Sequence, residues 1–284
     1  MSQRPIKGLR ILITGASQGI GRALALRAAA QGAQVLAAAR SQELLQGLAE
    51  ESARAGNPLS IVHADVTSPE DRATMLQAAQ DSLGGLDVLV NNAGIGATGH
   101  FVDATADRLR KIMEVNLFGL VETTRTFLPM LKAGRHAAIL NISSIAGKRG
   151  IPARSEYSAS KFAVQGFSEA IRAELAKDNV DVLIVSPGLT QTNFSQNMLE
   201  QKALLKMDHL RGMTAEAVAD ATLAALAKGK AETTLTFQGK LLVLVSRFLP
   251  RLADRIAARK VRALFQNERA AASPPARGRV WARG

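Results

Sequence analysis

From residue 10 to residue 237 the chain alternates between two kinds of segment. Short runs rich in valine, isoleucine and leucine predict strands of a parallel sheet, because strands covered on both faces lack a polar side. These runs are Arg10–Thr14, Gln34–Ala39, Leu59–Ala64, Asp87–Asn91, Ala137–Ile142, Asp181–Ser186 and, more weakly, Thr233–Phe237. Longer segments between them repeat their apolar residues with a helical period. The predicted helices are Ile20–Gln31, Gln42–Ala55, Pro69–Leu83, Ala106–Lys132, Tyr157–Lys177 and Ala215–Ala227.

Strands that alternate with helices imply βαβ units, so the pattern predicts an α/β protein. We expect a doubly wound parallel sheet of about seven strands, followed by a helical C-terminal extension. Residues 1–239 contain no linker rich in glycine or proline, and we interpret them as one domain. Residues 240–266 are expected to form the extension. Residues 267–284, rich in Ala, Pro, Arg and Gly, are expected to be a disordered tail.

The net charge of +12 over 284 residues could suggest a nucleic-acid partner, but the charge is concentrated at one end. Eleven of the 36 basic residues and two of the 24 acidic residues lie from Lys240 onward, so residues 1–239 carry only +3. The basic end has no aromatic stacking platform, and we expect no nucleic-acid binding.

The absence of cysteine excludes thiolate chemistry. The four histidines are scattered without ligand spacing, and we expect no metal site.

The extension has the pattern of a basic amphipathic helix. Arg251, Arg255, Arg259 and Arg262 form one stripe, Leu249, Leu252, Ile256 and Leu264 fall on another side, and an apolar run, Leu241–Val245, precedes them. Such a helix over residues 241–265 can lie on an anionic membrane, or it can pack on the protein body or on a second subunit. No run of roughly 18 apolar residues predicts a membrane span. We expect a cytoplasmic protein, with peripheral membrane contact as the alternative.

A glycine-rich turn follows the first predicted strand, in the sequence Thr14-Gly15-Ala16-Ser17-Gln18-Gly19-Ile20-Gly21. A strand, a glycine turn and a helix N-terminus together can bind a dinucleotide pyrophosphate, because free N–H groups and the helix dipole face the anion. Gly15 would form the turn, Gly19 would allow close approach, and Gly21 would let the helix pack on the strand. The alternative is an ordinary tight connection.

The spacing T-G-x-x-x-G-x-G resembles that of the short-chain dehydrogenase/reductase family, and further family motifs follow in order over residues 8–237. They are Asp65 after the third strand, Asn91-Asn92-Ala93-Gly94 after the fourth, Asn116 in a helix, Ser143-Ser144 after the fifth strand, Tyr157-Ser158-Ala159-Ser160-Lys161, and Pro187-Gly188 after the sixth. The resemblance implies that residues 1–239 are an NAD(P)-binding Rossmann catalytic domain, with a substrate lid at about 190–212.

The same resemblance implies the roles of four catalytic residues. Tyr157 is the acid/base, and Lys161 lowers its pKa and binds the nicotinamide ribose. Lys161 lies four residues further on and so shares a helical face with Tyr157. Ser144, preferred to Ser143 on its spacing of 13 residues from Tyr157, would hold the substrate oxygen. Asn116 would hold a water that connects Lys161 to solvent. The alternative for Asn116 is a structural hydrogen bond to the sheet.

The residue after the second strand predicts which cofactor is used. This strand ends Ala39-Arg40-Ser41 without an acid, so we expect NADP in preference to NAD, although Gln18 stands where many NADP-preferring members have a basic residue. Thr190 and Thr192 are expected at the carboxamide or diphosphate. The expected cofactor contacts are Gly15, Ser17, Gln18, Gly19, Ile20, Gly21, Arg40, Ser41, Asp65, Val66, Asn91, Ala93, Gly94, Tyr157, Lys161, Pro187, Gly188, Thr190 and Thr192.

The resemblance thus implies an NADP(H)-dependent oxidoreductase that interconverts a ketone and a secondary alcohol. Apolar residues in the lid, among them Phe194 and Met198, favour an apolar substrate of lipid or steroid type. The alternatives are a carrier-bound 3-oxoacyl reductase and a non-catalytic NADP-binding sensor or scaffold. Family members commonly pair through their long helices, here Ala106–Lys132 and Tyr157–Lys177, so we expect a homodimer or homotetramer.

Overall fold

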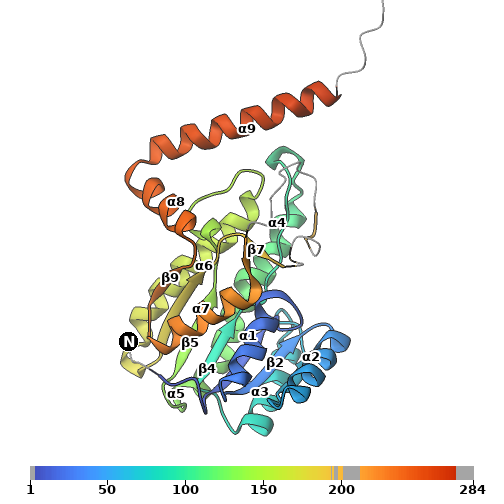
Figure 1. Ribbon diagram of the computed structural model, residues 1–284, viewed down its shortest axis with the longest axis vertical. Helices are drawn as coiled ribbons and strands as arrows, with labels where there is room; N and C mark the ends of the chain where they lie inside the picture. Colours follow the sequence, from blue (N-terminus) through green and yellow to red (C-terminus); the bar gives the residue numbers. More distant parts are fainter. Residues whose placement is uncertain (1–3, 193, 195–197, 201–211, 273–284) are drawn as a thin grey trace, which may run out of the picture.

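The predicted parallel sheet forms the centre of the protein. The computed structural model describes residues 4–192, 194, 198–200 and 212–272 (Figure 1). Seven parallel strands lie in the order β3-β2-β1-β4-β5-β6-β9, which confirms the doubly wound α/β fold. The strands are β1 (Arg10–Thr14), β2 (Gln34–Ala39), β3 (Ser60–His63), β4 (Val88–Asn91), β5 (Ala138–Ile142), β6 (Asp181–Ser186) and β9 (Glu232–Thr234). The register places Ile11 opposite both Val35 and Val88.

Helices cover both faces of this sheet. One core packs α1 (Gly19–Ala30), α2 (Gln42–Arg54) and α7 (Ala215–Ala227) on one face. The other core packs α3 (Pro69–Leu83) and α5 (Gly119–Lys132), together with the end of α6 (Ser155–Glu174), on the opposite face. Neighbouring residues of β1 divide between the two cores, with Ile11 and Ile13 in the first and Leu12 in the second. Both faces are therefore buried, as the unbroken apolar runs predict.

The strand order reverses between β1 and β4, and this reversal decides where the site lies. The chain runs from β1 outward through β2 to β3, then returns to β4 on the other side of β1. At such a switch point the connections leave the two strands in opposite directions and open a crevice at their carboxyl ends. The glycine turn after β1 and the loop after β4 both lie at this edge.

Three elements differ from the sequence expectation. The helix predicted at Ala106–Lys132 is interrupted: α4 (Ala106–Met113) ends in a π-helical turn, Glu114–Phe118, before α5 begins. The strand predicted at Thr233–Phe237 ends at Thr234, because Thr236 accepts a hydrogen bond from the Gly239 amide (2.9 Å) and so caps the next helix. Part of the predicted lid forms β7 (Thr190–Gln191), which pairs with β8 (Met213–Thr214); residues 193, 195–197 and 201–211 lie outside the described residues.

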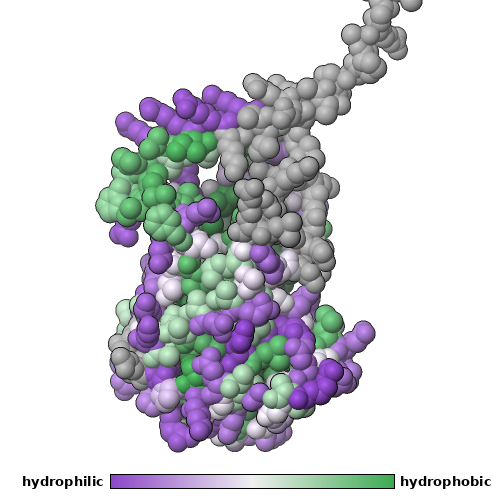
Figure 2. All heavy atoms as spheres, in the orientation of Figure 1, coloured by the Kyte–Doolittle hydropathy of each residue, from purple (hydrophilic) through white to green (hydrophobic). Residues whose placement is uncertain are grey.

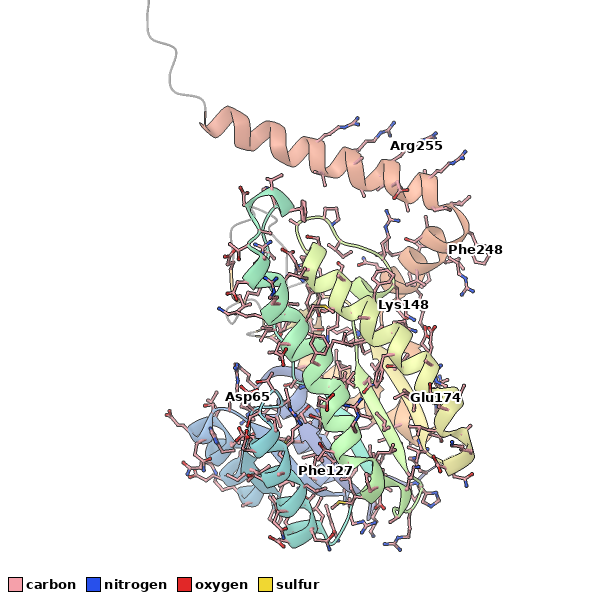
Figure 3. The ribbon with its side chains drawn as sticks, turned by 180° about the vertical axis from the view of Figure 1, so that it is seen from behind. Asp65, Phe127, Lys148, Glu174, Phe248 and Arg255 are labelled. Atoms are coloured by element: carbon pink, nitrogen blue, oxygen red, sulfur yellow. The ribbon has the colours of Figure 1, made fainter. Side chains whose placement is uncertain are left out.

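The C-terminal extension consists of two helices, α8 (Phe237–Phe248) and α9 (Pro250–Ala272), which extend away from the sheet (Figure 1). Residues 267–272, expected in a disordered tail, thus lie in α9. Figure 2 shows apolar side chains gathered on α8 and hydrophilic side chains along the outer side of α9, where Figure 3 places Arg255. An ion pair from Arg149 to Asp254 (2.6 Å) joins α9 to the body. Within the described part of the chain, no helix is long and apolar enough to cross a membrane.

Candidate active site

A cleft of about 540 Å³ opens at the switch point. It runs from the glycine turn after β1, past the ends of β4 and β5, to the described residues of the lid. The structure brings most of the predicted site to its walls: Gly15, Ser17, Gln18, Gly19, Ile20, Arg40, Ser41, Asp65, Val66, Ala93, Gly94, Ser144, Tyr157, Lys161, Pro187, Gly188, Thr190 and Thr192. The lining does not include Gly21, Asn91 or Asn116, which lie behind the walls.

The glycine turn has the conformation and packing of an anion cradle. Gly15 and Gly19 have positive φ angles of 65° and 57°, which residues with a side chain rarely adopt. A Cβ on Gly21 would lie 2.3 Å from the Gly15 carbonyl oxygen, so this position has no room for a side chain. Gln18 precedes α1, and its side chain makes no capping hydrogen bond. Within the described part of the chain, no side chain caps the first N–H groups of α1, which leaves them available to a phosphate.

Two adjacent asparagines stand at the end of β4, and the sequence analysis named the more buried one, Asn91, as a cofactor contact. Asn91 is buried, and its Nδ2 donates to Asn141 Oδ1 (2.9 Å) and Thr124 Oγ1 (3.0 Å), so its side chain ties β4 to β5 and α5 rather than facing the cleft. Asn92 Nδ2 donates to the carbonyl oxygens of Thr14 (3.0 Å) and Gly15 (3.1 Å). Asn92 thereby fixes the glycine turn, a role that sequence reasoning missed.

The cleft also extends from the glycine turn to the residues that follow β2 and β3, and this end of it is polar. The Arg40 side chain is 65% exposed, and its guanidinium lies 3.5 Å from the Asp65 carboxylate. Burial acts to raise the pKa of Asp65, but hydrogen bonds from Thr67 and the charge of Arg40 outweigh it, and the pKa falls. Ser41 caps α2 by accepting from the Leu44 amide. Arg40 thus keeps several donors and the freedom to turn toward a ligand.

At the opposite end, Ser144, Tyr157 and Lys161 converge. Tyr157 and Lys161 lie one turn apart on α6, and both are buried. The Tyr157 hydroxyl is hydrogen-bonded to Ser144, whose Oγ also accepts from the Ala146 amide (3.1 Å). Lys161 Nζ donates to the Ile142 carbonyl oxygen (3.0 Å) and lies 5.9 Å from the centre of the Tyr157 ring. Ser144 is thus the member of the Ser143-Ser144 pair in contact with Tyr157.

Burial shifts both titrating groups toward their neutral forms. It raises the pKa of Tyr157, although the hydrogen bond to Ser144 and the charge of Arg154 act in the opposite direction. It lowers the pKa of Lys161 from 10.5 to about 8. In the free protein, desolvation of the phenolate outweighs the groups that lower the pKa of Tyr157, namely Ser144 and Arg154. The lowering expected from Lys161 stays a prediction. Tyr157 is a protonated phenol at neutral pH, the form that can give a proton to a carbonyl oxygen.

Asn116 is fully buried in the π-helical turn between α4 and α5. Its Oδ1 accepts from the Ile95 amide (2.8 Å), and its Nδ2 donates to the Ile95 carbonyl (2.9 Å) and Ser160 Oγ (2.9 Å). The side chain therefore joins the loop after β4 to α6, directly behind Lys161. These contacts fit the structural alternative for the side chain, although the partner is this loop rather than the sheet.

Two buried arginines near the site were missed by the sequence analysis. Arg108 binds Glu156 of α6 and Glu200 of the lid, and so anchors the described end of the lid. Arg154 immediately precedes α6 and lines the cleft, with its guanidinium carbon 5.9 Å from the centre of the Tyr157 ring. The spacing of three residues from Tyr157 was the only available signal, because an arginine at a helix start is ordinarily exposed.

Comparison with known proteins identifies the family. The family model described as short chain dehydrogenase matches residues 10–203. Dehydrogenase/reductase SDR family member 7B of Mus musculus is 34% identical over 92% of this chain and 84% of that protein. Ketoacyl reductase HetN of Nostoc sp. is 32% identical over 88% of each. A short chain dehydrogenase from Burkholderia cenocepacia, solved in complex with NADP, is 30% identical, with a TM-score of 0.74 over 90% of this chain and 98% of that one. The chain therefore belongs to the short-chain dehydrogenase/reductase family.

Proposed function

We propose that this protein is an NADP(H)-dependent oxidoreductase that interconverts a ketone and a secondary alcohol on an otherwise apolar substrate. The observation that carries the proposal is the contact between the Ser144 and Tyr157 hydroxyls, one helical turn from Lys161. This group lies in the same cleft as the anion cradle at the glycine turn. A dinucleotide that spans the cleft would place its pyrophosphate at the glycine turn, its adenosine ribose near Arg40 and its reactive ring beside Tyr157.

The residues present fit a nicotinamide dinucleotide. The phosphates would be held by the free N–H groups at the start of α1, and Gly15 and Gly19 let a ligand approach the backbone there. Thr192 lies against the same turn, since its Cγ2 would be 3.3 Å from a Cβ on Gly19. When bound, the nicotinamide supplies or accepts the hydride. The chain itself must position the substrate and move the proton.

The three converging side chains can do both. Ser144 holds the substrate oxygen, and Tyr157 gives that oxygen a proton during reduction, because its phenol is protonated at neutral pH. The ammonium of Lys161 stabilises the phenolate that Tyr157 leaves, and its pKa of about 8 suits it to return a proton. Asn116 lies directly behind Lys161, and we propose that a water held at its π-helical turn completes the path to solvent.

Arg40 supports the proposed preference for NADP over NAD. No acid ends β2 to bind a ribose 2′-hydroxyl, and the exposed guanidinium of Arg40 can form a fork with a 2′-phosphate. Arg40→Asp should weaken NADPH binding by at least about tenfold while changing NADH binding much less. Arg54→Asp, at the other end of α2, is the matched control for net charge. Equal losses for NADPH and NADH would remove Arg40 from the phosphate site.

Apolar side chains on the substrate side of the cleft support the proposed substrate class. Ile95, Leu189, Phe194 and Met198 line it, and the Phe194 ring lies 5.8 Å from that of Tyr157. A panel of ketones and secondary alcohols of increasing chain length, followed by NADPH absorbance, tests the proposal. Turnover should rise with chain length; no turnover of any ketone would favour the sensor alternative. The similarity to a ketoacyl reductase keeps a 3-oxoacyl substrate as the second candidate.

The extension supports a proposal about partners. Phe237, Leu244, Phe248 and Ile256 are more than half exposed, so these side chains are not packed on the body. We propose that α8 and α9 are covered in a homodimer or homotetramer, with contact of residues 241–265 with an anionic membrane as the alternative. Light scattering and vesicle flotation separate the two. Leu244→Glu should reduce the subunit number in the first case and abolish flotation in the second.

A further inference from the structure

Arg154 is buried, yet no oxygen acceptor binds its guanidinium among the described residues. Its side chain lines the cleft, and only 9% of the residue is exposed. Among the described residues, its Nε has no hydrogen-bond partner, and the guanidinium makes one hydrogen bond, from Nη2 to Met198 Sδ (4.0 Å). Sulfur is a weak acceptor. Most of the donors of this cation are therefore left for something that enters the cleft.

The other buried arginines show how this fold satisfies an arginine that only supports structure. Arg4 binds Asp181 and the Leu226 carbonyl, and Arg72 donates to the Val66 carbonyl (2.7 Å). Arg108 binds two carboxylates, those of Glu156 and Glu200. Buried charges are ordinarily paired because desolvation is costly. Arg154 is the one described buried arginine that lacks an oxygen partner.

The charges around Arg154 favour a negatively charged ligand for its guanidinium. Among the described residues that line this half of the cleft, the other ionised group is Lys161, which is also cationic. The nearby carboxylates are hydrogen-bonded to other groups. Glu156 accepts from Arg108 and Ser155, and Glu200 accepts from Arg108. Burial lowers the pKa of Arg154, so its charge is already disfavoured before a ligand arrives. A negative group bound here would relieve that penalty and gain a bidentate hydrogen bond.

The position of Arg154 relative to Tyr157 identifies where the anion sits on the substrate. Arg154 lies about one helical turn before Tyr157, and its guanidinium carbon is 5.9 Å from the Tyr157 ring centre. We propose that Arg154 binds a carboxylate of the substrate. The substrate is therefore an oxo acid or hydroxy acid with an apolar chain, such as a 3-hydroxy acid, whose carboxylate lies only a few bonds from the reacting carbonyl or hydroxyl group. This inference rests on the proposed oxidoreductase function and narrows its substrate class.

Binding of simple acids tests the anion site without any turnover. The protein loaded with NADP is titrated with octanoate and with octanamide, which has the same length but no charge. Octanoate should bind roughly 10- to 100-fold more tightly, and Arg154→Met should remove that difference while leaving octanamide binding unchanged. Arg125→Met, at a surface ion pair with Glu122, is the matched control and should keep the preference. Equal binding of the two probes to the wild-type complex would overturn the proposal.

Turnover separates this inference from the proposed function. Oxidation of 3-hydroxyoctanoate should exceed that of 3-hydroxyoctanamide by at least about tenfold in kcat/KM, and Arg154→Gln should reverse the order. Equal oxidation of both alcohols would refute the anion site and leave the oxidoreductase intact. Tight, Arg154-dependent octanoate binding without oxidation of any alcohol would refute the proposed function and keep the anion site. The wild-type comparison needs no variant, so misfolding of one cannot hide the answer.

Discussion

Replacing Lys161 by methionine should make the free protein more stable while removing its activity. Lys161 is buried, and desolvation lowers its pKa from 10.5 to about 8. One pKa unit corresponds to about 1.4 kcal/mol, so holding the ammonium in the fold at pH 7 costs about 3 kcal/mol. Lys161→Met removes this penalty but also removes the hydrogen bond to the Ile142 carbonyl, worth about 1 kcal/mol. The net expectation is a gain of about 2 kcal/mol in the free energy of unfolding.

The pH dependence distinguishes desolvation from a simple packing effect. Because the folded pKa of Lys161 is lower than the unfolded one, the unfolded chain binds more protons between about pH 8 and pH 10.5. The wild type therefore loses the penalty as the pH rises through this window, whereas the methionine variant has none to lose. The advantage of Lys161→Met should shrink by about 2 kcal/mol between pH 7 and pH 9.5.

Urea unfolding of the cofactor-free protein, at one fixed protein concentration and at both pH values, measures this difference. Titration of all other groups cancels in the comparison with the wild type. Lys177→Met, at an exposed position after α6, is the control and should show no pH-dependent difference. A Lys161→Met variant that is less stable at pH 7, or whose advantage stays constant between the two pH values, would refute the reasoning.

Two further substitutions test the cradle and the π-helical turn. Gly21→Ala places a methyl group 2.3 Å from the Gly15 carbonyl oxygen. It should lower the free energy of unfolding by about 1–3 kcal/mol and weaken NADPH binding by at least about tenfold. The control is Gly47→Ala, which has open space around it and should stabilise α2 by up to about 1 kcal/mol. Asn116→Ala removes three hydrogen bonds, two to the Ile95 backbone and one to Ser160, and should cost about 2–4 kcal/mol in urea unfolding. A loss below about 1 kcal/mol would contradict a structural role.

The fold and the residue types of the site could be predicted because their signals are local. Unbroken apolar runs identify strands buried on both faces, and glycines 15, 19 and 21 identify a turn without room for side chains. Tyr157 and Lys161 share a helical face by spacing alone. The bounds of the interruption at residues 114–118 could not be predicted, since the apolar period continues through it and the Asn116 side chain binds residues distant in the sequence, Ile95 and Ser160.

Long-range packing decides the remaining features of the site. Arg154 is buried in a cleft that Met198 and Phe194 of the lid also line, and both lie about forty residues further along the chain. Asn91 and Asn92 have different roles because their side chains face different sides of the sheet. Asn91 contacts α5, and Asn92 contacts the glycine turn. The raised pKa of Tyr157 also follows from burial, which the sequence does not show.

The most direct test of the proposed chemistry is the turnover of Tyr157→Phe with the best ketone of the panel, measured beside its affinity for NADPH. The phenylalanine keeps the ring and its packing against Phe194 but lacks the hydroxyl that contacts Ser144. We expect kcat to fall by about 100- to 10,000-fold, with the NADPH dissociation constant within about threefold of the wild type. Turnover within about tenfold of the wild type would contradict the role of Tyr157 as the proton donor.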